Sequence, residues 1–234
     1  MHKVISQENI ADGIFRITVD IINEARPGQF YMILPPGGAF SLRRPISVHD
    51  STAFTASFLY QVKGRGTKAI SLLKSGDELD LVGPLGNGFS FLAQDSVFVG
   101  GGLGIAPLFY AIKEFKRAYP GKTAACYLGF SGEAFLTKEY EEISDSFGYM
   151  QSGFITDIVE AGSNAYYACG PEAMLEALLK KAGREAHYLA SFEARMGCGV
   201  GACYSCSIKT ASGNVRVCTQ GPVLSAKEVF YEQA

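Results

Sequence analysis

Midway along the chain lies Val97-Phe98-Val99-Gly100-Gly101-Gly102-Leu103-Gly104-Ile105-Ala106-Pro107, an apolar run that passes through four glycines. The residues before the glycines predict a buried strand, and residues 105–118 predict a helix that tolerates Pro107 in its first turn. A turn between a strand and a helix presents backbone N–H groups to a pyrophosphate. Because the spacing is not G-x-G-x-x-G, close packing of the turn remains the alternative interpretation.

Downstream of this run, strand and helix patterns alternate. Residues 123–128 and 165–169 predict further strands, and residues 171–181 predict a helix. Such alternation indicates a parallel sheet wound by right-handed crossovers, which we assign to residues 93–190. Ligands of such sheets bind beyond the carboxyl ends of the strands, so Cys169, at the end of its strand, is a candidate for the same crevice. A small buried thiol without chemistry is the alternative.

Upstream, residues 1–92 alternate apolar and polar positions in short runs that are separated by Gly, Pro, Asn and Asp. A period of two with frequent turns predicts a small antiparallel barrel or sandwich. One helix is expected inside it, from Thr67 to Lys74, with Thr67 as its N-cap and Gly76 closing it.

Two polar elements of this first domain are candidates for phosphate binding. In the segment Ser41–Ser47, Arg44 offers a planar fork to phosphate, Pro45 holds Arg44 extended, and Ser47 can donate to a ring heteroatom. The segment Leu59–Thr67 is a strand and a glycine turn whose N–H groups make a second cradle. A solvated surface turn is an equally open interpretation of the arginine segment.

The last segment, residues 191–234, holds the spacing Cys198-x4-Cys203-x2-Cys206-x11-Cys218. It matches the plant-type pattern of [2Fe–2S] proteins. Gly197, Gly199 and Gly201 suit a chain that folds tightly over a cluster, because glycine tolerates positive φ and lets N–H groups approach the sulfurs. Structural zinc, which usually takes two separate cysteine pairs, and disulfides remain alternatives.

Composition and charge exclude other classes of protein. Hydrophobic residues make up 47% and charged residues 19%, which indicates a folded chain, and a net charge of −2 gives no field to hold nucleic acid. The N-terminal residues carry no basic stretch followed by an apolar run, so we expect a cytoplasmic protein. The uncharged residues 96–112 are too few and too rich in glycine for a membrane span.

The order of these elements resembles the ferredoxin reductase superfamily, and most closely the electron-transfer subunits of class 1B dihydroorotate dehydrogenase. Arg44-Pro45-Ile46-Ser47 is similar to the flavin motif of that superfamily, Gly100 to Pro107 to its nicotinamide turn, and Cys169-Gly170-Pro171 to its motif near the site of hydride transfer. The resemblance implies an antiparallel flavin-binding β-barrel, a parallel-sheet nicotinamide-binding α/β domain, and a small C-terminal iron-sulfur subdomain.

The resemblance also implies the cofactors FAD, a [2Fe–2S] cluster and NAD. Ile46 stands where many members have a tyrosine that stacks on the flavin, and Tyr60 is our candidate for that role. Glu133 would repel a 2′-phosphate, which favours NAD over NADP. The implied residues are Cys198, Cys203, Cys206 and Cys218 for iron; Arg44, Pro45, Ile46, Ser47, Leu59, Tyr60, Gln61, Gly66 and Thr67 for FAD; Gly100, Gly102 and Gly104 for the nicotinamide; and Cys169 and Glu193 at the catalytic position.

A cluster passes single electrons and a nicotinamide takes a hydride, so a flavin must stand between them. The sequence shows no further redox motif and no obvious site for an organic substrate, which implies a partner. By resemblance, the partner is an FMN-containing dihydroorotate dehydrogenase subunit of pyrimidine biosynthesis in a heterotetramer, with NAD⁺ as diffusible acceptor. Two alternatives remain: the small subunit of an NAD(P)H-linked ferredoxin, hydrogenase or sulfite reductase complex, and a zinc-binding module without catalysis.

Overall fold

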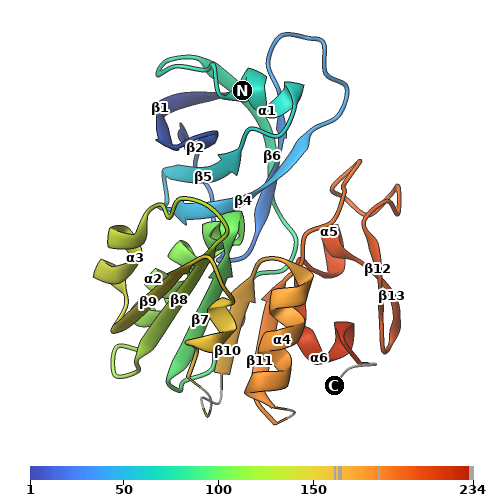
Figure 1. Cartoon of the computed structure of the whole chain (residues 1–234). Coiled ribbons are helices and arrows are strands. Elements are labelled where there is room, and N and C mark those ends of the chain that lie inside the picture. The colour runs from blue at the N-terminus through green and yellow to red at the C-terminus, as the bar shows by residue number, and fades with distance from the viewer. Residues whose placement is uncertain (161, 163–164, 184, 232–234) are drawn as a thin grey trace.

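The computed structural model describes residues 1–160, 162, 165–183 and 185–231. It contains a barrel, a six-stranded sheet and a small cysteine-bearing segment at the side of both (Figure 1). No helix among these residues is both long enough and apolar enough to cross a lipid bilayer.

Six antiparallel strands close the barrel in the order β1-β2-β5-β4-β3-β6. Alternate side chains fill its interior, among them Val19, Tyr31 and Phe58, so the period-two pattern of the sequence is the pattern of burial. The strands are β1 His2–Ala11, β2 Ile14–Asp20, β3 Phe30–Leu34, β4 Arg44–Ser51, β5 Thr55–Gln61 and β6 Glu78–Leu85.

The helix between β5 and β6 differs from the prediction. It is α1 Arg65–Ile70, and Gly64 in an extended conformation is its N-cap. Thr67 is the third helical residue, and its Oγ1 accepts N–H bonds from Lys63 at 3.0 Å and Gly64 at 3.3 Å. The Thr67 hydroxyl therefore satisfies N–H groups at the helix start, but Thr67 is itself a helical residue. The sequence pattern alone does not distinguish this position from the N-cap.

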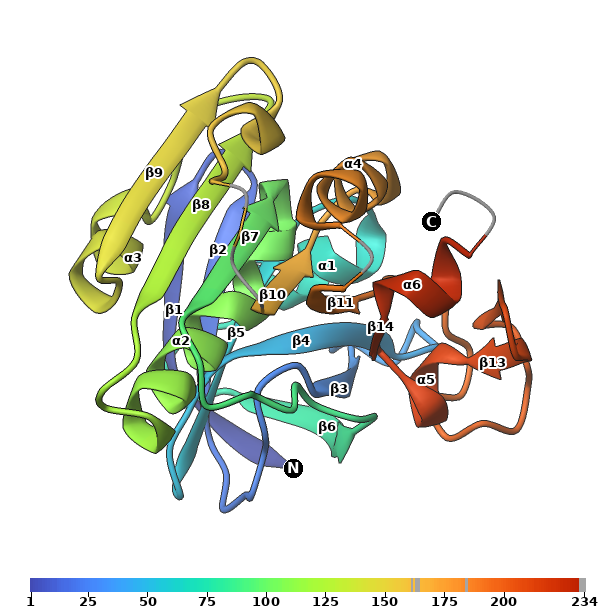
Figure 2. The ribbon, with the colours of Figure 1, turned by 90° about the horizontal axis from the view of Figure 1, so that it is seen from below.

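The sheet has the strand order β14-β11-β10-β7-β8-β9, with all pairs parallel except β14 on β11. Helices α2 and α3 cover one face and α4 and α6 the other (Figure 2). On β7, Phe98 packs on the α2 side and Val97 and Val99 on the α4 side, so both faces are buried and the strand is apolar without alternation.

The predicted elements of this domain lie close to the observed ones, but α3, β9 and β11 were not predicted. β9 is an edge strand without a buried residue, and it lacks the unbroken apolar run that marks β7 and β10. The elements are β7 Ser96–Gly101, the 3-10 helix η1 Gly102–Ile105, α2 Ala106–Ala118, β8 Ala124–Phe130, α3 Thr137–Ile143, β9 Ser146–Gln151, η2 Ile155–Asp157, β10 Ala165–Cys169, α4 Glu172–Ala182 and β11 His187–Ser191.

The C-terminal segment packs on both other parts. It comprises β12 Ser207–Thr210, β13 Gly213–Arg216, α5 Val217–Gln220, β14 Val223–Ser225 and α6 Ala226–Val229. Strand β14 pairs with β11 at the edge of the six-stranded sheet, so the C-terminal segment contributes one strand to the α/β domain. The fold class is confirmed, while the boundaries 1–92, 93–190 and 191–234 stay a prediction; residues 232–234 lie outside the described residues.

Candidate functional site

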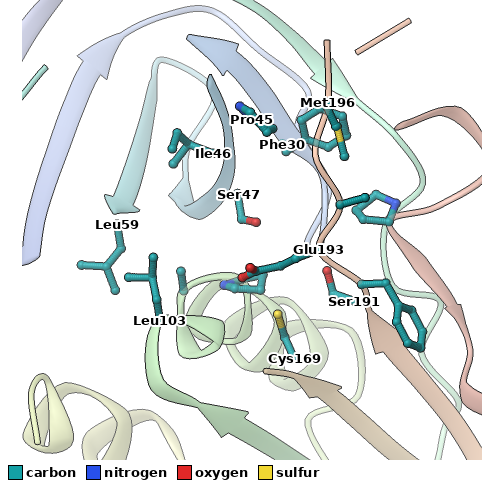
Figure 3. A pocket seen from close by; sticks show the side chains of 15 residues that line it. Phe30, Pro45, Ile46, Ser47, Leu59, Leu103, Cys169, Ser191, Glu193 and Met196 are labelled. Atoms are coloured by element: carbon teal, nitrogen blue, oxygen red, sulfur yellow. The ribbon is translucent and has the colours of Figure 1, made fainter. Parts of the chain in front are cut away.

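A pocket of about 160 Å³ lies between the barrel and the sheet, and we call it the interdomain pocket (Figure 3). Its walls come from five parts of the sequence: the barrel strands, residues 100–107, which we call the glycine turn, the end of β10, the segment after β11, and Pro222 just before β14. The lining residues are Phe30, Pro45, Ile46, Ser47, Leu59, Leu103, Ala106, Pro107, Cys169, Ser191, Phe192, Glu193, Ala194, Met196 and Pro222.

On the barrel wall, neighbouring residues of β5 point in opposite directions. Leu59 lines the pocket, whereas the ring of Tyr60 lies inside the barrel, 1% exposed. Its hydroxyl accepts a hydrogen bond of 2.6 Å from Gln7 Nε2, and burial raises its pKa to about 12. The expectation that Tyr60 stacks on a flavin is therefore wrong, because successive side chains of a strand face opposite sides.

The opposite wall carries Cys169, whose position in the sheet is beside Gly100 of β7 and Ser191 of β11. Burial raises the pKa of this thiol to about 12; the charge of Glu193 adds to the rise, and a hydrogen bond with the Ser191 hydroxyl opposes it. Cys169 is thus a neutral thiol at physiological pH. The Glu193 carboxylate points into the pocket from the segment after β11 (Figure 3).

Two of the three predicted nicotinamide glycines are explained by packing. A Cβ on Gly104 would collide with the carbonyl of Cys169, and one on Gly100 would lie 2.9 Å from Ile105 Cγ2. Gly102 alone faces open space, and its φ of +54° is in the region that favours glycine. Close packing therefore requires glycine at residues 100 and 104, while their contact with a nicotinamide stays a prediction, and only at Gly102 is the space open to a ligand.

A second cleft, which we call the outer cleft, opens beyond the carboxyl ends of β7 and β8. It brings Gly102 together with Asp12 and Gln61 of the barrel and Glu133 of the segment after β8. Two carboxylates therefore border it, one from each domain, and Asp12 is a residue that sequence reasoning missed. The lining residues are Ala11, Asp12, Ile14, Gln61, Gly102, Leu103, Phe130, Ser131, Gly132, Glu133 and Phe135.

Arg44 lies directly over Gly66: a Cβ on Gly66 would approach Arg44 Nη2 to 2.7 Å. The guanidinium also donates to the carbonyl of Leu42 at 2.8 Å. Its neighbour Arg43 is instead held by Asp80 in two bonds of 2.7 and 3.0 Å, which lower the pKa of that carboxyl. Arg44 is therefore the arginine of the pair that remains available to an anionic ligand at the α1 turn.

In residues 198–218, which we call the cysteine loop, the two less buried thiols, Cys198 and Cys203, lie beside hydrogen-bonding groups that favour negative charge on sulfur. Cys198 Sγ accepts N–H bonds from Val200, Ala202 and Cys203 at 3.3–3.4 Å, and those from Cys203 and Val200 lower its pKa most. Ser205 Oγ lies 3.1 Å from Cys203 Sγ, and the hydroxyl and backbone of Ser205 lower the pKa of Cys203 to about 6. Ser205 was missed by the sequence analysis.

The four thiols form two pairs, Cys198 with Cys203 and Cys206 with Cys218, each within hydrogen-bonding reach. Cys206 and Cys218 are buried, and burial raises the pKa of Cys218 to about 11. Among the described residues, no three side chains of His, Cys, Asp or Glu are arranged around one metal ion. Each pair can supply two thiolates to one iron of a [2Fe–2S] cluster. The feature that stands against structural zinc is the spacing, which puts three of the four cysteines within residues 198–206.

The cysteine loop packs on the barrel beside the interdomain pocket. Cys206 and Cys218 belong to an apolar cluster with Phe30 and Met32 of β3, and Met196 packs against it. Gly199, with φ of +73°, lets the loop approach, since a Cβ there would overlap Met32. Phe30 and Met196 also line the pocket, so the same two side chains separate the loop from the pocket.

Comparison with known proteins bears on this arrangement. Residues 193–230 match the model of the iron-sulfur cluster binding domain of dihydroorotate dehydrogenase B. The electron transfer subunits of dihydroorotate dehydrogenase B (NAD⁺) from Listeria innocua and Caldanaerobacter subterraneus are 37% and 38% identical to this chain; the alignments span 97% and 98% of it and 97% of each relative. The chain belongs to this family of electron transfer subunits.

Solved structures place the subunit among ferredoxin-reductase-like folds. The structure of an NADH-dependent reduced ferredoxin-NADP oxidoreductase is similar over 100% of this chain and 91% of that one, with a TM-score of 0.86 and 27% identity. A cytochrome P450 reductase from Amycolatopsis matches over 80% of this chain and 68% of that one, with a TM-score of 0.67 and 23% identity, which shows the fold alone.

For this subunit, the predicted family, fold, oxidoreductase class and the cofactors FAD, [2Fe–2S] and NAD are confirmed. The individual site residues stay predictions. The structure brings Ser47, Cys169 and Glu193 to one pocket, whereas the Thr67 hydroxyl is engaged in its own helix and Gln61 lies in the outer cleft.

Proposed function

We propose that this subunit carries electrons from an FMN-containing catalytic subunit, which oxidises dihydroorotate to orotate, to NAD⁺. The route runs through a [2Fe–2S] cluster on the cysteine loop and FAD in the interdomain pocket. The observation that carries the proposal is the contact between the two sites: the thiol pairs and the pocket share Phe30 and Met196 as neighbours.

Cys198, Cys203, Cys206 and Cys218 would hold the two irons. The N–H groups that face Cys198 and the Ser205 hydroxyl beside Cys203 stabilise negative charge on the sulfurs, which is what a ligated cluster requires. The iron itself deprotonates coordinating thiols, so the two buried cysteines can also ligate.

Pro45, Ile46, Ser47 and Leu59 would face the flavin ring, and Arg44 over Gly66 would bind its pyrophosphate. When bound, FAD supplies the exchange between single electrons and the hydride of the nicotinamide. Ser47 offers a hydroxyl to a ring heteroatom. We retain Tyr60, Gln61 and Thr67 only as chain neighbours of Leu59 and Gly66.

Across the pocket, Cys169 and Glu193 would face the reacting carbon of the nicotinamide. A thiol kept neutral by burial donates a hydrogen bond without placing an anion beside the ring. The Glu193 carboxylate can accept hydrogen bonds from the carboxamide of the nicotinamide or from Ser47. These residues orient the reactants and do not themselves react.

The outer cleft would take the rest of the dinucleotide. Its position beyond the strand ends suits a nucleotide, and Gly102 exposes backbone there. Asp12 and Glu133 would repel a 2′-phosphate, which favours NAD over NADP. The need for a site that oxidises the organic substrate calls for a partner subunit. FMN in that partner and a heterotetrameric assembly are what the family resemblance implies.

The test is reconstitution. The purified chain should show flavin and iron-sulfur absorbance, contain two irons and two sulfides, and oxidise NADH with ferricyanide. It should form NADH from dihydroorotate only after the catalytic subunit is added. Zinc in place of iron, or dihydroorotate turnover by the chain alone, would contradict the proposal.

A second candidate function rests on the similarity to the NADH-dependent reduced ferredoxin-NADP oxidoreductase. In that case the partner would be a subunit that reacts with ferredoxin. Co-purification separates the two functions: a catalytic subunit that reacts with dihydroorotate supports the first, and one that reduces ferredoxin supports the second.

A further inference from the structure

A buried imidazole links the two walls of the interdomain pocket. His49 lies on β4, two residues after Ser47, and is 1% exposed. Its Nδ1 lies 2.9 Å from the carbonyl oxygen of Ala106. Ser47 lines the barrel wall of the pocket and Ala106 lines the opposite wall, so this hydrogen bond joins the walls directly where β4 packs on α2 (Figure 1).

The surroundings fix the ring and its tautomer. His49 stacks on Phe109, with ring centroids 4.9 Å apart and an interplanar angle of 29°. Because the Ala106 carbonyl can only accept, Nδ1 carries the proton. Burial lowers the pKa of His49 to about 4, although the Ala106 carbonyl raises it, so the ring is neutral at physiological pH.

The second ring nitrogen of His49 lowers the stability of the fold. Nε2 is buried and has no hydrogen-bond partner among the described residues. An unpartnered buried nitrogen destabilises a fold, and an apolar side chain would fill the same space without that cost. The bond made by Nδ1 is therefore the feature that explains an imidazole at this position.

The glycine turn is held on its other side as well. The Tyr140 hydroxyl of α3 donates to the carbonyl of Ile105 at 2.6 Å, one residue before Ala106. Gly104 packs on the backbone of Cys169. Of these three restraints, only the bond of His49 comes from the barrel, and it holds Ala106 directly against β4. The ion pair of Lys113 with Asp50 also ties α2 to β4, but neither of its residues lines the pocket.

We infer that His49 is a positioning residue that sets the separation of the two pocket walls through its bond to Ala106. This inference rests on the proposed function, in which the flavin lies on the barrel wall and the nicotinamide on the turn wall. Hydride transfer depends steeply on the distance between donor and acceptor, and a displacement of 1 Å can cost about 100-fold in rate. A looser wall should therefore slow transfer more than it weakens NADH binding.

Tyr110 supplies a matched control. Its hydroxyl donates to the carbonyl of Ala25 at 2.9 Å, so it also ties α2 to the barrel through a buried side chain. Unlike Ala106, neither partner of this bond lines the interdomain pocket. Loss of the Tyr110 bond weakens the domain contact without touching the pocket walls.

The experiment compares His49→Leu, His49→Asn and Tyr110→Phe in the flavin- and cluster-loaded chain. Flavin reduction by NADH is followed in a single turnover. We expect His49→Leu to be slowed about tenfold, with a larger isotope effect from deuterated NADH and little change in the NADH concentration that gives half the maximal rate. His49→Asn places an N–H near the position of Nδ1 and should recover most of the rate. Tyr110→Phe should shift the melting temperature comparably and leave the rate unchanged.

A readout independent of activity is the tautomer of His49. Long-range ¹H–¹⁵N NMR of the oxidised chain should show protonation at Nδ1 only, between pH 6 and 8. A proton on Nε2 overturns the inference, and so do equal rates in His49→Leu and Tyr110→Phe. A wild-type chain that binds FAD but is not reduced by NADH contradicts the proposed function itself, whereas a reactive wild type with an unaffected His49→Leu variant contradicts only the role of His49.

Discussion

The cysteine loop and the glycine turn are both rich in glycine, but the glycines serve different purposes. In the loop, Gly199 and Gly201 have φ of +73° and +82° and bend the chain around the sulfurs. In the turn, Gly100 and Gly104 are required by close contact with neighbouring backbone and side chains. A glycine-rich run therefore indicates a backbone that other residues cannot adopt or a place without room for a side chain. The residues that surround it in space decide whether it binds a ligand or serves packing.

The largest effect is expected in the loop. Replacement of Cys203 by Ser removes an iron ligand, and the cluster should be lost almost completely. Iron and sulfide content and the EPR signal of the reduced protein measure this. Cys126→Ala is the control, because Cys126 is buried in the core of the sheet and should not affect the cluster. A full-occupancy signal in Cys203→Ser would contradict the assignment.

The two regions should also differ in thiol reactivity once the cluster is removed. The pKa of Cys203 is lowered to about 6 and that of Cys169 is raised to about 12. At pH 7.5, Cys203 is a thiolate and Cys169 a thiol, so iodoacetamide should label Cys203 more than about 100 times faster. Labelling of Cys203 should fall as the pH drops below 6. Peptide mass spectrometry of timed samples measures both rates. Labelling of Cys169 as fast as that of Cys203 would contradict the expected difference between the two thiols.

Within the turn, Gly104→Ala and Gly102→Ala test which glycine is set by packing. The new methyl at residue 104 meets the carbonyl of Cys169, whereas at residue 102 nothing lies within 4 Å. We expect Gly104→Ala to lower the free energy of unfolding by at least about 1–3 kcal/mol, because the methyl overlaps the Cys169 carbonyl. Gly102→Ala should lower it by about 1 kcal/mol, because alanine disfavours the left-handed conformation of this residue. Urea denaturation measures both. A larger loss in Gly102→Ala would reverse the interpretation.

The flavin site should respond to Arg44→Ala. Loss of a charged hydrogen bond to the pyrophosphate costs about 1.5–3 kcal/mol, which corresponds to roughly tenfold or more in FAD affinity. FAD retained after gel filtration measures the change, and Arg44→Lys should be intermediate. Arg117→Ala, on the exposed side of α2, should retain FAD like the wild type. Unchanged flavin content in Arg44→Ala would exclude its proposed role.

The smallest effect is expected at the outer cleft. Removal of both carboxylates in Asp12→Asn/Glu133→Gln should improve the KM for NADPH by several-fold and change that for NADH little, because exposed charges are screened by salt. Glu142→Gln, an exposed residue of α3 that is not among the lining residues, is the control. An unaltered preference between the two coenzymes would remove both residues from the site.

Two predictions failed in the exact position of a side chain. Tyr60 and Leu59 are neighbours on β5, and the sequence does not reveal which of them faces the barrel interior. Thr67 carries the right atom for a cap but sits inside the helix. The sequence analysis did not find Asp12 and His49, because the residues that they meet belong to distant parts of the chain. It did not find Ser205 either, because the contact with Cys203 depends on the backbone conformation of the loop.

The residue types and their spacing determined the local chemistry: four thiols in a tight loop, an apolar strand before a glycine turn, and the change from a period of two to alternating strands and helices. These features depend on contacts within short stretches of chain, so they can be deduced from sequence. Only the tertiary structure decided that the cysteine loop packs against the interdomain pocket and that His49 bridges its walls. Both facts depend on how distant elements pack, and packing is fixed by the shape and burial of the whole core.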